Sequence, residues 1–134
     1  MISTWTTRGL VLVLPLLATF AAAAEHTTDS LAEVRKNVAE KKAVLIDVRE
    51  TVEWNAGHVA GAISLPIVEI ERKKIAPEVL AKLPKDRILY TYCVVGMRSK
   101  KAAGILEKQG YEVRALKPGY DDLLKAGFTS EKAK

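Results

Sequence analysis

Short apolar runs that alternate with helical patterns constrain the fold of this chain more than any other feature. AVLIDV, residues 43–48, is a continuous apolar run that meets an aspartate, and RILYTY, residues 87–92, and YEVRAL, residues 111–116, are further strand-like runs. A continuous run of this length is typical of a strand buried on both faces, as in a parallel sheet. We therefore predict an α/β domain with a small, mainly parallel sheet.

Helical patterns separate the predicted strands. Ser30 and Glu33 form a capping-box pattern that predicts a first helix directly after them. Residues 98–110 predict a longer helix, and residues 68–86 predict mostly helical structure interrupted at Pro77. Helices between successive parallel strands are expected to cover both faces of the sheet. Shorter elements are predicted as helical turns in residues 52–57 and 121–127 and a strand in residues 62–67.

The first 24 residues have the composition of a secretory signal peptide. Arg8 precedes an apolar run, residues 9–24, that ends in alanines. The run has 16 residues and contains Pro15, whereas about 20 residues are needed to span a bilayer, so a cleaved signal is favoured over an uncleaved anchor. We expect cleavage after Ala24, a mature chain of residues 25–134 without a membrane segment, and a periplasmic or secreted protein.

Charge and residue content exclude several classes of function. The chain has 21 basic and 16 acidic residues, and removal of the signal takes away one basic residue and no acidic one. This mild excess lies in short clusters without interleaved aromatics, so we predict no nucleic-acid binding, whereas small anions remain possible partners. One cysteine and two distant histidines offer no metal-ligand spacing, and no glycine-rich nucleotide loop is present, so we expect no metal and no cofactor.

Cys93, the one cysteine of the chain, stands between the predicted strand 87–92 and the predicted helix 98–110. Ligands of parallel α/β sheets bind at this carboxyl end of the strands. Free backbone N–H groups and the helix dipole would lower the pKa of the thiol below its free value of about 8.5. A lone cysteine in an exported protein forms no internal disulfide. By itself, a cysteine after a buried strand is more often an inert small hydrophobe, so the neighbouring residues decide between this and a reactive thiolate.

The residues that follow Cys93 favour the reactive thiolate. Gly96 permits a positive φ angle or a close approach of backbone to a bound group. Arg98 supplies a fixed charge that would hold an anionic substrate over the sulfur. A helix dipole disfavours an arginine at a helix start, so its position predicts an anion nearby. Ser99 is expected to cap the helix.

Two stretches resemble one known family. CVVGMRS, residues 93–99, looks like the active-site loop of the rhodanese sulfurtransferases, whose six-residue loop begins with the cysteine that carries a persulfide. DVRETVEWNAGHVAGAISLP, residues 47–66, resembles the family's amino-terminal signature: Asp-x-Arg, an acid before an aromatic residue, Gly-His, Gly-Ala and the proline. The resemblance covers about residues 30–128 and implies a single rhodanese-like domain, with helices on both faces of its sheet.

The chain departs from the family pattern in LKPGYDDLL, residues 116–124. Many relatives have two glycines and a later aromatic residue where this chain has Pro118, Gly119 and Leu123. The packing of the last helix is therefore open. Pro118 and Gly119 predict a type II turn before it.

The resemblance implies a sulfurtransferase that needs no cofactor. Cys93 would attack the outer sulfur of a small anionic donor such as thiosulfate, become a persulfide, and pass that sulfur to a thiophilic acceptor, cyanide or a thiol. The Arg98 side chain would bind the oxygens of the donor. Backbone amides of the loop would hold the persulfide, namely those of Val94, Val95, Gly96, Met97 and Arg98.

Two other functions stay open. The domain is alternatively a persulfide carrier that accepts sulfur from an exported partner protein and hands it on. A cysteine phosphatase or arsenate reductase is less favoured, because only four residues separate Cys93 from Arg98, one fewer than in the phosphatase signature.

Other polar residues are assigned structural roles. We expect an ion-pair network of Asp47, Arg49 and Glu53, because a preformed thiolate needs no paired carboxylates. His58 is expected to be packed and hydrogen-bonded in a tight turn beside a glycine. His26 is expected in a frayed terminus.

Overall fold

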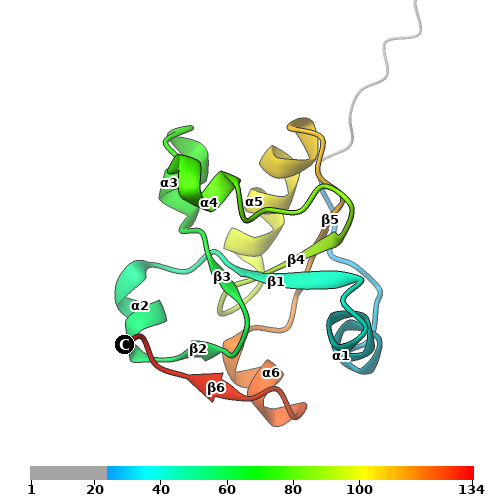
Figure 1. Cartoon of the computed structure of the whole chain (residues 1–134). Coiled ribbons are helices and arrows are strands. Elements are labelled where there is room, and N and C mark those ends of the chain that lie inside the picture. The colour runs from blue at the N-terminus through cyan, green and yellow to red at the C-terminus, as the bar shows by residue number, and fades with distance from the viewer. Residues whose placement is uncertain (1–23) are drawn as a thin grey trace, which may run out of the picture.

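A four-stranded parallel sheet forms the centre of the computed structural model, which describes residues 24–134. The expected signal peptide lies outside these residues apart from Ala24. The strand order is β3-β1-β4-β5 (Figure 1). The α/β prediction is therefore confirmed. The strands are β1 (Ala43–Asp47), β3 (Ile63–Ser64), β4 (Ile88–Tyr92) and β5 (Val113–Ala115).

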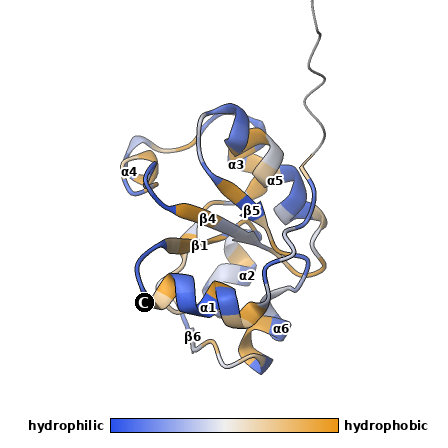
Figure 2. Cartoon of the chain, turned by 90° about the vertical axis from the view of Figure 1, so that its right-hand side faces the viewer, coloured by the Kyte–Doolittle hydropathy of each residue, from blue (hydrophilic) through white to orange (hydrophobic). Residues whose placement is uncertain are grey.

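Helices cover both faces of the sheet, as predicted. Neighbouring strand residues point to opposite faces, so Leu45 and Ile46 of β1 belong to two separate cores. The first core lies under α3 (Ile67–Glu71), α4 (Pro77–Leu80) and α5 (Met97–Lys108), and the second under α1 (Leu31–Ala39) and α6 (Tyr120–Lys125) (Figure 1). The longer helices α1 and α5 each bury one face, and Figure 2 shows hydrophobic and hydrophilic residues alternating along α1.

The first helix begins where the sequence predicts. The Ser30 hydroxyl accepts the backbone N–H of Glu33, and the Glu33 carboxylate accepts the backbone N–H of Ser30. Residues 68–86 differ from the prediction, because they form two short helices with a non-helical stretch between them. Pro77 begins α4 rather than interrupting a longer helix, since a proline at the first helical position gives up no intrahelical hydrogen bond.

The segment before α6 also differs from the prediction. Gly119 has φ −98° and ψ −170°, which is extended backbone and not the positive φ of a type II turn. A glycine is needed there for another reason: a Cβ at this position would collide with the carbonyl oxygen of Val94. The backbone N–H of Tyr120 donates to the carbonyl oxygen of Cys93 at 2.9 Å. The start of α6 therefore packs directly against the Cys93 loop.

A second, two-stranded sheet was not predicted. It pairs β2 (His58–Val59) with β6 (Ser130–Glu131) in antiparallel orientation. Strands this short carry no recognisable alternation in the sequence. The remaining helix, α2 (Thr51–Ala56), follows β1 and ends before Gly57. Within residues 24–134, no helix is long and apolar enough to cross a membrane.

Candidate active site

Cys93 is the first residue after β4 and is only 1% exposed. Its Sγ accepts two backbone N–H groups, from Gly96 at 3.2 Å and from Ser99 at 3.4 Å. Gly96 precedes α5 and has φ +89°, a left-handed conformation that suits glycine, and this turns the loop back over the sulfur. The loop thus encloses the sulfur with main-chain donors, as the sequence predicts.

The surroundings of Cys93 favour the thiolate. Burial by itself raises the pKa of the Cys93 thiol, but the backbone N–H groups of Ser99, Gly96 and Arg98 outweigh it. The pKa of the thiol consequently lies below its ordinary value. A thiolate is the nucleophilic form of cysteine, so this site is suited to nucleophilic chemistry.

Four further N–H groups of the loop have no backbone acceptor among residues 24–134. The first four N–H groups of any helix lack an intrahelical partner. Together with the helix dipole, such donors are suited to hold an anion that is attached to, or lies beside, the sulfur. They belong to Val94, Val95, Met97 and Arg98.

The side chains of the loop form an apolar rim around the buried sulfur. Val95 is 70% exposed and Met97 is 77% exposed, and Val94 is also exposed. Large exposed apolar side chains that cluster in one loop mark a contact surface rather than a packed core. Of the predicted loop residues, Gly96 donates its N–H to the sulfur, whereas Val94, Val95 and Met97 have exposed apolar side chains.

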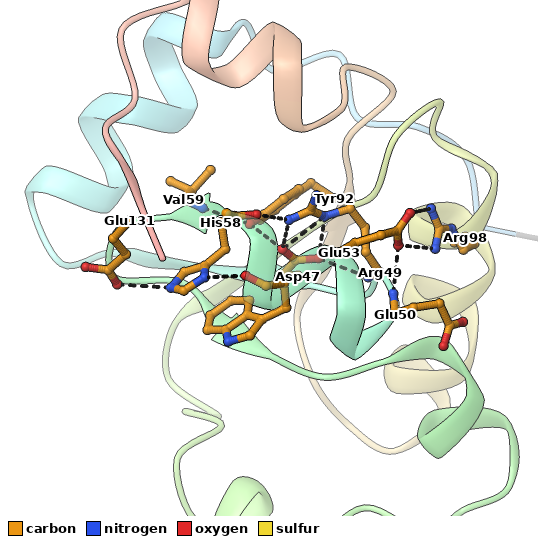
Figure 3. A network of polar contacts seen from close by, with 11 residues as sticks. Asp47, Arg49, Glu50, Glu53, His58, Val59, Tyr92, Arg98 and Glu131 are labelled. Carbon is orange, nitrogen blue, oxygen red and sulfur yellow. Dashed lines mark hydrogen bonds and ion pairs between the residues drawn. The ribbon is translucent and has the colours of Figure 1, made fainter. Parts of the chain in front are cut away.

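The side chain of Arg98 is bound to a carboxylate. Its two terminal nitrogens donate to the two oxygens of Glu53, at 2.8 and 3.1 Å (Figure 3). This bidentate pair lowers the pKa of the Glu53 carboxyl and raises that of Arg98. The anion that the sequence predicts beside Arg98 is thus present within the chain itself.

Asp47 and Arg49 form the structural ion pair that the sequence predicts, and both are buried. The Arg49 guanidinium donates to both oxygens of Asp47 and to the carbonyl oxygen of Gly57. The hydroxyl of Tyr92 donates to Asp47 at 2.7 Å (Figure 3), and burial raises the pKa of Tyr92. Glu53 makes no hydrogen bond to this pair and bonds Arg98 instead. Two of the three predicted members of the network therefore pair directly, and the third bonds the Cys93 loop.

His58 is packed, as predicted. Its ring stacks on Trp54 with 3.4 Å between ring centroids, and its Nδ1 donates to the carbonyl oxygen of Trp54. Its Nε2 lies 3.2 Å from a carboxylate oxygen of Glu131 in β6 (Figure 3). These contacts tie α2 to the small sheet and leave His58 away from the sulfur.

Two residues contact the loop in ways that sequence reasoning missed. His26 is not in a frayed terminus. It forms an isolated parallel β-bridge with Ala115, the last residue of β5. Its Nε2 lies 2.7 Å from the carbonyl oxygen of Gly96. Ser99 does not cap α5, because Gly96 occupies that position; its hydroxyl instead lies near the carbonyl oxygens of Gly96 and Leu116. No local pattern signals either contact, since each depends on segments distant in sequence.

Within residues 24–134, no three His, Cys, Asp or Glu side chains lie close enough together to hold a metal ion. The polar groups of the site are the Cys93 thiol, the main-chain N–H donors of its loop and the pair of Arg98 with Glu53.

Similar proteins share this fold. The probable adenylyltransferase/sulfurtransferase MoeZ of Mycobacterium tuberculosis is 39% identical over 92 residues, 68% of this chain and 22% of that protein. The uncharacterized protein YqhL of Bacillus subtilis is 35% identical over 92 residues, 68% of each chain. The human single-domain sulfurtransferase TSTD1 has a TM-score of 0.64 at 30% identity, with 75% of this chain and 97% of that one covered.

The chain thus spans about a fifth of MoeZ but nearly the whole of the single-domain human structure. The family model described as Rhodanese-like domain matches residues 30–126, from the N-cap of α1 to the residue that ends α6. The matched stretch contains the whole parallel sheet and the Cys93 loop. The chain belongs to the Rhodanese-like domain family.

Proposed function

We propose that this protein is a sulfurtransferase that carries sulfur as a persulfide on Cys93. One observation carries the proposal: a buried sulfur that accepts two main-chain N–H groups, with a thiol pKa held below its ordinary value. Sulfur transfer as the general activity is also supported by the family and by relatives named as sulfurtransferases. Thiosulfate as donor, and cyanide or a thiol as acceptor, are the finer part of the proposal.

The proposed reaction has two displacement steps. In the first, the Cys93 thiolate attacks the outer sulfur of thiosulfate, a new S–S bond forms, and sulfite leaves with the electron pair of the broken S–S bond. In the second, the acceptor attacks the outer sulfur of the persulfide, and Cys93 leaves as the thiolate. With cyanide the product is thiocyanate. No external oxidant or reductant is needed.

The loop supplies donors for both charged species. A persulfide would place its outer sulfur about 2 Å from Sγ, in a loop that has four N–H groups without a backbone acceptor among residues 24–134. Arg98 has five N–H donors, of which Glu53 occupies two. The remaining donors are available to the oxygens of the donor anion, so Arg98 can bind the anion while it is paired with Glu53.

Intact-mass analysis tests the proposal. We expect the purified protein to gain one sulfur atom after exposure to thiosulfate and to lose it after exposure to cyanide. The Cys93→Ser variant should gain none. A wild-type protein that takes up no sulfur from thiosulfate or from a small persulfide contradicts the proposal, and rapid cleavage of an aryl phosphate without sulfur uptake would favour the phosphatase alternative.

A carrier role is a second candidate, and the apolar rim favours it. Val94, Val95 and Met97 expose apolar side chains directly beside the sulfur, where a small hydrophilic anion gains nothing from them. A partner protein that delivers or accepts sulfur would bury them. A carrier exchanges sulfur rapidly with a protein persulfide and turns over free thiosulfate slowly, and comparing these two rates separates the candidates.

We also propose that the protein is exported. Support comes from the N-terminal composition, in which one arginine precedes an apolar run of 16 residues that ends in alanines. Fractionation of the producing cells, with mass determination of the recovered protein, tests this. We expect a mature chain that begins at Glu25 outside the cytoplasm, and a full-length protein in the cytoplasm would contradict it.

A further inference from the structure

The segment before α1, residues 24–29, runs along the edge strand β5 (Figure 1). The backbone N–H of Thr27 donates to the carbonyl oxygen of Ala115 at 2.8 Å. The carboxylate of Asp29 accepts the hydroxyl of Tyr90 at 2.6 Å and a guanidinium N–H of Arg114 at 2.8 Å. Two points downstream of His26 therefore anchor the segment to the sheet.

His26 reaches from this anchored segment to the Cys93 loop. A carbonyl oxygen only accepts hydrogen bonds, so the contact of 2.7 Å requires a proton on Nε2, with the ring as donor to Gly96. Both the neutral ring in this tautomer and the charged ring supply that proton. Among residues 24–134, this is the one polar partner of the His26 side chain.

The carbonyl of Gly96 is a point where several contacts compete. Besides His26, the Ser99 hydroxyl lies 2.9 Å from it and the Lys100 N–H lies 3.2 Å from it. The Ser99 hydroxyl has one proton and lies closer, at 2.7 Å, to the carbonyl oxygen of Leu116. With His26 serving Gly96, Ser99 is free to bond Leu116, which links α5 to the end of β5.

Gly96 is also the residue whose N–H donates to the sulfur. A Cβ on Gly96 would lie 2.8 Å from His26 Nε2 and 3.0 Å from the backbone of Lys117, so the glycine is held between the two. The N–H and the C=O of Gly96 flank the same Cα, so a displacement of this residue away from His26 would also move its N–H relative to Sγ.

We propose that His26 is a positioning residue that holds the Cys93 loop closed over its sulfur through the carbonyl of Gly96. The segment that carries His26 is thereby part of the active site, although it is distant in sequence from the cysteine. Only one part of the test, the rate of persulfide formation, rests on the proposed function.

The test compares His26→Leu, which fills similar space without a donor, with His26→Gln, whose amide can donate from a similar distance. The pKa of the chain's one thiol is measured by the pH dependence of its alkylation, which requires no sulfur transfer. A lost neutral hydrogen bond typically corresponds to a change of about 3- to 10-fold. We expect His26→Leu to raise the thiol pKa and to slow persulfide formation by about this factor. His26→Gln should restore the thiol pKa and the rate of persulfide formation to near the wild-type values.

Asp29→Asn is the matched control, because it weakens the anchoring of the same segment without touching the loop. We expect it to lower the unfolding temperature and leave the thiol pKa unchanged. Should leucine prevent folding, His26→Ala repeats the measurement. An unchanged thiol pKa in a folded variant without the donor, or an equal shift in Asp29→Asn, overturns the inference. If the wild type takes up no sulfur, the alkylation measurement still decides the role of His26.

Discussion

Two polar clusters lie side by side at the carboxyl ends of neighbouring parallel strands. Asp47, the last residue of β1, pairs in register with Tyr92, the last residue of β4, and Cys93 follows at once. In the first cluster, the charges of Asp47 and Arg49 neutralise each other, and the Arg49 guanidinium also donates to the carbonyl oxygen of Gly57. In the second, the sulfur accepts two N–H groups, and four further N–H groups of the loop have no backbone acceptor among residues 24–134.

The difference separates structure from chemistry. A buried charge must be compensated, and once compensated it has little affinity left for a substrate. Free main-chain donors around an anionic sulfur have the opposite property: they are ready for a charge that the reaction brings. Burial alone does not distinguish the two clusters, because Asp47 and Cys93 are both buried.

The largest expected effect follows from removing the sulfur. Cys93→Ser should abolish sulfur uptake and transfer, while the far-ultraviolet circular dichroism and the unfolding transition stay close to those of the wild type, because the change leaves little cavity. Thiocyanate production from thiosulfate and cyanide measures the first, and thermal unfolding the second. Residual thiocyanate at the wild-type rate would remove Cys93 from the mechanism.

Removing one partner of the compensated cluster should mainly affect stability. Arg49→Ala leaves Asp47 buried without its cation, which typically costs about 3–5 kcal/mol. Urea unfolding measures this cost, and the thiol pKa of the folded fraction should not change. Lys42→Ala is the control, since its pair with Glu40 is exposed and solvent screens such pairs. Equal effects of the two variants would contradict the comparison.

The packing of α6 against the loop is tested at Gly119. Gly119→Ala would push a methyl group into the carbonyl oxygen of Val94. We expect a loss of about 1–3 kcal/mol in the free energy of unfolding, typical of forced overpacking, together with slower persulfide formation. Gly104→Ala is the matched control: its Cβ would meet Ala24 at an ordinary 3.6 Å, and alanine favours the helix by up to about 1 kcal/mol. If Gly119→Ala left the free energy of unfolding unchanged, the Cys93 loop would be able to move and accommodate the methyl group.

The sulfur cluster predicts a specific pH dependence. Because the pKa of Cys93 is lowered in the folded state, alkylation of the folded protein should reach half of its maximal rate at a lower pH than alkylation of the denatured protein. The thiolate then stabilises the fold above the unfolded-state pKa, and this contribution is lost as the pH falls through the folded-state pKa. Since the chain has one cysteine, the signal has one source. Coincident titrations would contradict the proposed cradle.

The smallest effect is expected from the pair between the two clusters. Glu53→Gln removes the charge that faces Arg98 and should tighten thiosulfate binding, with a KM lower by up to about fivefold, as expected for a partly exposed pair worth up to about 1 kcal/mol. Glu50→Gln changes the same charge in the adjacent turn without a bond to Arg98. A raised KM in Glu53→Gln alone would mean that the pair positions Arg98 more than it competes for it.

The sequence by itself determined the fold class, the parallel strands, the first helix with its cap and the cysteine loop, because these depend on local periodicity, capping chemistry and motifs of neighbouring residues. It also predicted that Asp47 and Arg49 would pair, since they are two residues apart on one strand end. Local patterns were misleading in residues 68–86 and at Gly119, where a steric contact with a distant carbonyl oxygen, not a turn angle, requires glycine.

Only the tertiary structure decided which groups meet across the loop. Glu53 pairs with Arg98 and His26 bonds Gly96, 45 and 70 residues away respectively. The pairing of β2 with β6 likewise joins segments more than 70 residues apart. Such contacts are fixed by the crossing of whole elements over the sheet, and no periodicity within one segment carries that information.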